Sequence, residues 1–159
     1  MAISPNVRAA PWMQDTLRQG FALLAQGKPE QASECAKRLL GAKPDLVEGH
    51  FLVGLIAVEL KQNWTAVSAF GSVTKLRPDH AAAWAQLARL FMIAGQPGRA
   101  DKALAKAVEH NDENPLVLDT IAAVYTQLGD QEEAGTWIRR ALDKQPANVN
   151  FQVNLAHNY

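Results

Sequence analysis

The sequence predicts an all-α protein built from repeated pairs of antiparallel helices, and three observations support that prediction. Similar residues recur every 34 positions, each 34-residue unit holds two stretches of helical periodicity, and residues typical of helix ends flank those stretches. The chain has 159 residues, 48% of them hydrophobic, which is enough for one compact domain or a short array of repeats.

The 34-residue period is visible in three columns of residues. They are Gly20, Gly54, Ala88 and Ala122; Ala32, Ala66, Ala100 and Ala134; and Leu39, Val73, Ala107 and Ala141. Prolines at Pro44, Pro78 and Pro146 follow the same spacing, with Asp112 at the missing position. The first two columns fall on the two helices of a pair, where small residues let helices approach closely.

Helix ends are predicted from local signals. Apolar residues recur every three or four positions in 47–60 and again in 64–76. Asp45 with Glu48, and Asp130 with Glu133, have the spacing of capping boxes, while Asn114 precedes Pro115 as an N-cap precedes a first-turn proline. Between the paired helices stand glycines that can adopt positive φ, at Gly27, Gly95 and Gly129.

A 34-residue helix-turn-helix unit with these columns resembles the tetratricopeptide repeat family. The family's W-x2-L-G-x2-Y stretch is matched best by Trp84, Leu87, Ala88 and Phe91. The resemblance implies a right-handed superhelical α-solenoid of nine helices. It places four repeats at 13–46, 47–80, 81–114 and 115–148, after an N-terminal arm at 1–12. The last residues, 149–159, are predicted to be a capping helix or a truncated fifth repeat.

The charge pattern disfavours nucleic acids and membranes as partners. Sixteen basic and sixteen acidic residues cancel, and no basic stripe is present. The N-terminus has no apolar run of signal-peptide length, and the longest apolar run, 51–58, is too short to cross a bilayer. The single cysteine, Cys35, cannot form an internal disulfide. We therefore expect a cytoplasmic protein.

No arrangement of residues predicts catalysis, a metal or a cofactor. His50, His80 and His110 are spaced by 30 residues, so the 34-residue period puts them in different structural places. No phosphate-binding or nucleophile motif is found. We expect a protein that is not an enzyme and that has no catalytic residues, no metal and no cofactor.

By resemblance, the first helix of each repeat lines a concave groove with its residues 2, 5, 9 and 12. The predicted protein-binding residues there are Leu17, Phe21, Leu24, Phe51, Leu55, Val58, Arg89, Met92, Asp119 and Asn154. The N-terminal half of this groove is strongly apolar. A partner's amphipathic helix, the N-terminal arm with Pro11 and Trp12, or a second copy forming a homodimer could cover it. If the register of the weak first repeat is shifted by one residue, these side chains are core instead.

The sequence favours a non-catalytic protein–protein interaction scaffold or adaptor that binds a protein or peptide segment. The family's carboxylate clamp for chaperone C-termini is disfavoured, because its positions hold Leu17, Phe21, Leu52, Ala82 and Gln86. The alternative is the recognition arm of a larger enzyme, for example a sulfotransferase-type protein, whose catalytic domain lies beyond Tyr159.

Overall fold

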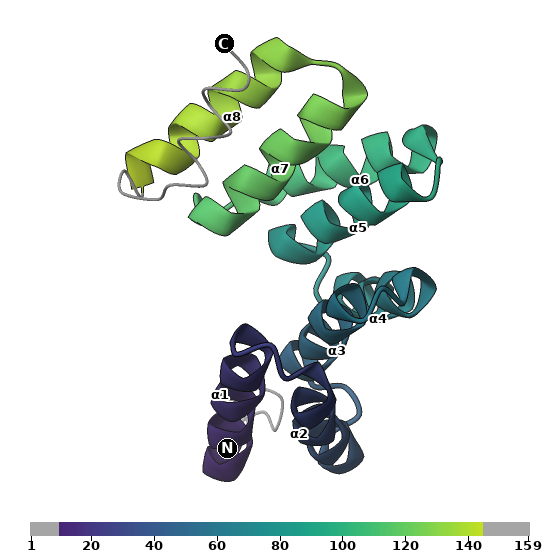
Figure 1. Cartoon of the computed structure of the whole chain (residues 1–159), viewed down its shortest axis with the longest axis vertical. Coiled ribbons are helices and arrows are strands. Elements are labelled where there is room, and N and C mark those ends of the chain that lie inside the picture. Colours follow the sequence, from purple (N-terminus) through teal and green to yellow (C-terminus); the bar gives the residue numbers. More distant parts are fainter. Residues whose placement is uncertain (1–9, 145–159) are drawn as a thin grey trace, which may run out of the picture. The chain divides into compact units, whose positions relative to one another are not determined.

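The computed structural model describes residues 10–144, and each regular element in this range is an α-helix (Figure 1). Eight helices are described there, whereas the sequence predicts nine. The ninth, predicted within residues 149–159, lies outside the described residues. The all-α fold class is confirmed.

The chain divides into two compact units between Arg77 and Pro78. Unit 1 has two helical hairpins, in which α1 packs against α2 and α3 packs against α4; α3 also packs against α1 and α2. The helices of unit 1 are α1 (Pro11–Ala25), α2 (Pro29–Ala42), α3 (Val47–Glu59) and α4 (Asn63–Leu76).

Unit 2 repeats this arrangement. Its hairpins are α5 with α6 and α7 with α8, and α7 also packs against α5 and α6. The helices of unit 2 are α5 (Ala81–Ile93), α6 (Pro97–His110), α7 (Pro115–Leu128) and α8 (Gln131–Lys144). The four hairpins follow one another at about the spacing of the predicted repeats, with α1 beginning two residues before the first repeat, 13–46.

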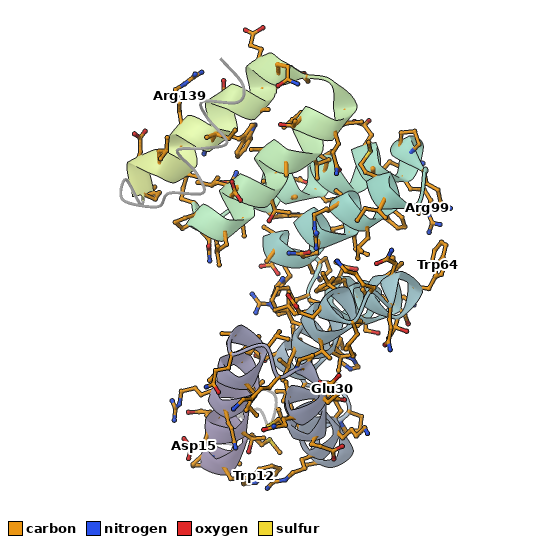
Figure 2. All side chains as sticks on the ribbon, viewed as in Figure 1. Trp12, Asp15, Glu30, Trp64, Arg99 and Arg139 are labelled. Carbon is orange, nitrogen blue, oxygen red and sulfur yellow. The ribbon has the colours of Figure 1, made fainter. Side chains whose placement is uncertain are left out.

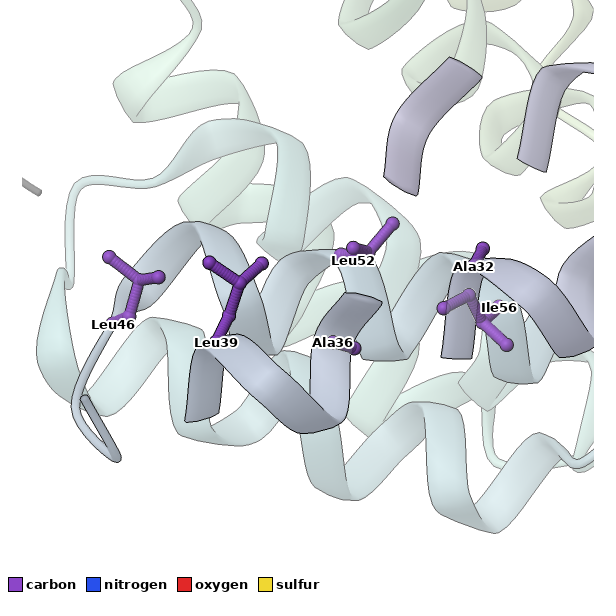
Figure 3. Packing of buried hydrophobic residues seen from close by; sticks show 6 residues of the cluster. All are labelled: Ala32, Ala36, Leu39, Leu46, Leu52 and Ile56. Atoms are coloured by element: carbon purple, nitrogen blue, oxygen red, sulfur yellow. The ribbon is translucent and has the colours of Figure 1, made fainter. Parts of the chain in front are cut away.

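One core cluster of unit 1 is contributed by α2, α3 and the turn between them (Figure 3). Its members are aliphatic and almost fully buried: Ala32, Ala36, Leu39, Leu46, Leu52 and Ile56. Burial of such apolar side chains supplies most of the free energy that stabilises packed helices of this length.

The repeated columns are the buried seams of the hairpins. Every member of the columns that begin at Ala32 and Leu39 is fully buried, with no exposed surface. A Cβ atom built on Gly54 would lie 2.5 Å from the Phe70 ring, and one on Gly20 would lie 2.7 Å from Leu52 Cδ2. The Gly54–Phe70 contact is a close approach within the α3–α4 hairpin, as predicted, and a larger residue at Gly54 would have to displace the buried Phe70 ring.

The turns inside the hairpins share one backbone conformation. Gly27, Gly95 and Gly129 have φ of 75°, 73° and 87°, as predicted. The fourth member of this column is not glycine: Lys61 adopts φ of 60°. Lys61 is therefore held in the left-handed region that side chains disfavour.

Most predicted caps form, but one does not. Asn114 Oδ1 accepts a hydrogen bond from Leu116 N at 2.9 Å, and Asp130 Oδ1 accepts one from Glu133 N at 3.1 Å. The capping box predicted at Asp45 is wrong. Leu46 is the N-cap of α3 and makes no side-chain cap, while the Asp45 carboxylate lies 3.7 Å from Lys43 Nζ.

The first helix begins earlier than the repeat pattern indicates. Pro11 stands in its first turn, where a missing N–H is harmless, and Thr16 Oγ1 donates to the Trp12 carbonyl at 2.8 Å. Pro11 and Trp12, predicted as part of an arm, thus belong to α1.

Candidate protein-binding face

Six of the predicted binding residues lie in unit 1, on α1 and α3. Leu17, Phe21 and Leu24 are spaced by four and three residues on α1, so they form one row along that helix. Phe51, Leu55 and Val58 form the corresponding row on α3, 34 residues later. The two helices contact each other where Gly20 meets Leu52, so the rows are neighbours. We call these six residues the α1–α3 face.

All six side chains of the α1–α3 face are partly buried rather than fully exposed. Leu17, Phe21 and Leu24 pack with their inner sides against the core cluster. Phe51 packs edge-to-face on Phe70, with ring centroids 5.4 Å apart. The face is thus anchored in the core and still presents apolar surface to solvent.

Leu55 and Val58 differ from the α1 row in one respect. Among the described residues, neither belongs to the side chains packed against the core cluster of unit 1. They are therefore the members of the face whose replacement should disturb the fold least.

The other predicted binding residues are more polar and lie in unit 2. Arg89 is half-buried and donates to Gln86 Oε1 at 2.8 Å, and burial lowers the pKa of its guanidinium. Met92 on α5 and Asp119 on α7 are partly buried. Asn154 lies outside the described residues.

Several large apolar residues outside the predicted set are more exposed than any predicted binding residue within 10–144: Trp12, Trp64, Leu76, Ile93 and Leu116. Leu116 on α7 is 68% exposed and Ile93 on α5 is 53% exposed. Leu116 occupies the second position of its repeat, so the register could have identified it. Ile93, at the end of α5, had no such signal.

The histidines and the cysteine serve separate structural roles. His50 Nε2 lies 2.7 Å from the Pro44 carbonyl, and His80 Nδ1 accepts a hydrogen bond from Ala83 N at 3.1 Å as the N-cap of α5. His110 Nε2 lies 3.6 Å from Glu109 Oε2 at the end of α6, and Cys35 is buried. Within residues 10–144, no three His, Cys, Asp or Glu side chains gather as metal ligands would.

A shallow groove of about 420 Å³ lies on a different part of unit 1. Its walls come from α2, α3 and α4, and Trp64 stands at its rim with 63% of its surface exposed (Figure 2). His50 and Val53, which line it on α3, do not belong to the α1–α3 face. The groove therefore offers a place for control substitutions in the same unit.

The known proteins that this chain resembles are consistent with a fold built from helical hairpins. Three family models, each described as tetratricopeptide repeat, match residues 17–65, 57–124 and 117–148. The chain belongs to the tetratricopeptide repeat family. Tetratricopeptide repeats generally mediate protein–protein interactions, which makes the role of an interaction scaffold the coarse functional assignment.

Among curated proteins, the tetratricopeptide repeat-containing protein trd-1 of Caenorhabditis elegans is 27% identical over 134 residues. The match covers 84% of this chain but 17% of trd-1, so the chain spans about one sixth of that relative.

Several solved structures share the fold, among them a protein described as a tetratricopeptide repeat protein. A chain of the human IFIT1 dimer with m7Gppp-AAAA superposes with a TM-score of 0.81 at 20% identity, over 92% of this chain and 35% of that one. TTC0263, a thermophilic protein of Thermus thermophilus, superposes with a TM-score of 0.68 at 19% identity, over 92% of this chain and 98% of that one. MamA from Desulfovibrio magneticus RS-1 superposes with a TM-score of 0.66 at 19% identity, over 95% of this chain and 85% of that one. None of the helices in residues 10–144 is both long and apolar enough to span a bilayer.

Proposed function

We propose that this chain is a non-catalytic protein–protein interaction scaffold that binds a partner segment through the α1–α3 face. The observation that supports the proposal is the pair of adjacent apolar rows on α1 and α3, six side chains that remain partly accessible. Helices in a groove recognise partners through apolar side chains spaced by three and four residues, the spacing of both rows. Binding would bury the apolar surface that each row still exposes, and this burial would contribute to the free energy of binding.

The double variant L55S/V58S tests this proposal. We expect it to keep the helix content of the wild type and to lose capture of the partner from extracts of the native cells. The matched control is W64S, which changes the exposed tryptophan of the α2–α4 groove in the same unit and should retain the partner. Helicity from circular dichroism and the captured proteins from mass spectrometry are the readouts. If L55S/V58S captures the same proteins as the wild type, the α1–α3 face is not the binding surface.

A second copy of the chain is one candidate partner for the same face. In that case the wild type would sediment as a dimer at micromolar concentrations and L55S/V58S as a monomer. A wild-type monomer over the whole concentration range would leave a different protein as the partner.

A second candidate function is the recognition arm of a larger protein. It is supported by the match to trd-1, in which the matched region is 17% of a longer chain. The mass of the native polypeptide, compared with the 17.3 kDa of this chain, tests it. A mass well above 17.3 kDa would favour the arm, and an equal mass would favour a free-standing adaptor.

A further inference from the structure

Two glutamates border the apolar row of α3. Glu48 lies three residues before Phe51, and Glu59 lies four residues after Leu55. Side chains three or four residues apart are neighbours on a helix surface, so Glu48, Phe51, Leu55 and Glu59 follow one another along α3. Eleven residues separate the two glutamates, which at the rise of an α-helix is about 16 Å.

Both carboxylates are exposed and unpaired. Within the described residues, neither Glu48 nor Glu59 takes part in a hydrogen bond or an ion pair. The charges on α1 differ in this respect, because Arg18 is paired with Asp15 on its own helix. The apolar face therefore has an acidic group at each end of its α3 row.

The two ends of the row are not equivalent. Near the start of α3, nearby charged side chains are paired with each other, in the ion pairs Asp15–Arg18 and Lys43–Asp45. At the other end, Lys28 and Lys61 lie in the turns that follow α1 and α3. A lysine two residues from Glu59 offsets part of its field, because the separation is within a Debye length. Glu48 lies in the first turn of α3, where the positive end of the helix dipole offsets part of its field in turn, so both carboxylates remain candidates to attract a cation.

We propose that the segment bound by the α1–α3 face is an amphipathic helix with a lysine or arginine at each end of its apolar stripe. The two cations are about eleven residues apart and pair with Glu48 and Glu59. The inference rests on the proposed function of the same face. Its basis is charge complementarity, since a partner with acidic ends would place like charges together over an apolar surface.

The test uses three synthetic helical peptides of about 18 residues, long enough to span the row. They share one leucine stripe and differ only at two flanking positions eleven residues apart, which hold lysine, glutamine or glutamate. Binding to the full chain is measured by fluorescence anisotropy. Exposed ion pairs of this kind change Kd by about twofold to fivefold each, so we expect the order lysine, glutamine, glutamate from tightest to weakest. The differences should shrink between about 0.02 M and about 0.5 M salt.

Variants then assign the effect to the two glutamates. E48Q/E59Q should bring the three Kd values together, and E48Q or E59Q alone should do so in part. The matched control is E30Q, which removes an exposed carboxylate from α2 in the same unit (Figure 2). It should leave the order unchanged.

The outcomes separate this inference from the proposed function. Equal Kd values for the three peptides in the wild type, with binding lost in L55S/V58S, would overturn the inference and support the face as a helix groove. The expected order retained in E48Q/E59Q would also overturn the inference. If no peptide binds, or if L55S/V58S binds them as the wild type does, both the inference and the proposed use of this face are wrong.

Discussion

Lys61 keeps the backbone conformation of the 34-residue pattern but not its glycine. The turn between paired helices needs positive φ, and three of its four occurrences use glycine. A lysine in this conformation brings its Cβ close to the following carbonyl, at a cost of roughly 1–2 kcal/mol.

We expect Lys61→Gly to stabilise unit 1 by about 0.5–1 kcal/mol. The relief of strain exceeds the extra freedom that glycine gives the unfolded chain. The free energy of unfolding in urea is the measurement. Lys61→Ala is the control, because alanine keeps the unfavourable φ while removing the same charge. Equal gains from both substitutions would show that the side chain, rather than the backbone, is responsible.

The helix pair is the element that the sequence describes best. The columns at Ala32 and Leu39 are buried in every repeat because a 34-residue repeat returns each position to the same seam. Helix ends are harder to predict from sequence. Asp45 has the right spacing for a cap, but it stands one residue before the N-cap Leu46. Its carboxylate lies near Lys43 instead, and this short-range competition is not visible in a spacing rule.

The α5–α6 pair provides a test of the tight packing between paired helices. Ala100 is fully buried on α6, and we expect Ala100→Leu to destabilise the protein by about 1–3 kcal/mol through overpacking. Ala105→Leu makes the same change on an exposed position of the same helix and should be nearly neutral. Thermal or urea unfolding followed by circular dichroism gives both values. An unchanged stability in Ala100→Leu would contradict a tightly packed seam.

At the scale of the whole molecule, the chain divides into two compact units. Leu52 lies in the core cluster of unit 1, within residues 10–77. Repeat arrays gain stability from neighbouring contacts, so different parts can open with different free energies.

We expect Leu52→Ala to cost about 2–5 kcal/mol locally and to speed amide hydrogen exchange mainly in residues 10–77. Mass spectrometry of peptides from 10–77 and 78–144 would measure this directly. Equal acceleration in both ranges would mean that the chain opens as one cooperative unit.

The candidate site was only partly accessible to sequence reasoning. The register places the two apolar rows on α1 and α3, because it depends only on position within a repeat. How far each side chain is exposed depends on packing: Phe51 lies against Phe70, whereas Leu55 is not among the side chains packed against the α2–α3 core cluster. That Glu48 and Glu59 have no ion-pair partner within residues 10–144 also needed the structure, since pairing is set by neighbours in space.

The buried alanine column restricts how the length of this chain can change. A residue added inside a helix turns everything after it by about 100°, which would move the seam away from its partner. A block of 34 residues, in contrast, returns every later alanine to its own hairpin. Whole repeats can therefore be duplicated or lost during evolution, while a gain or loss of one residue within a helix would be selected against.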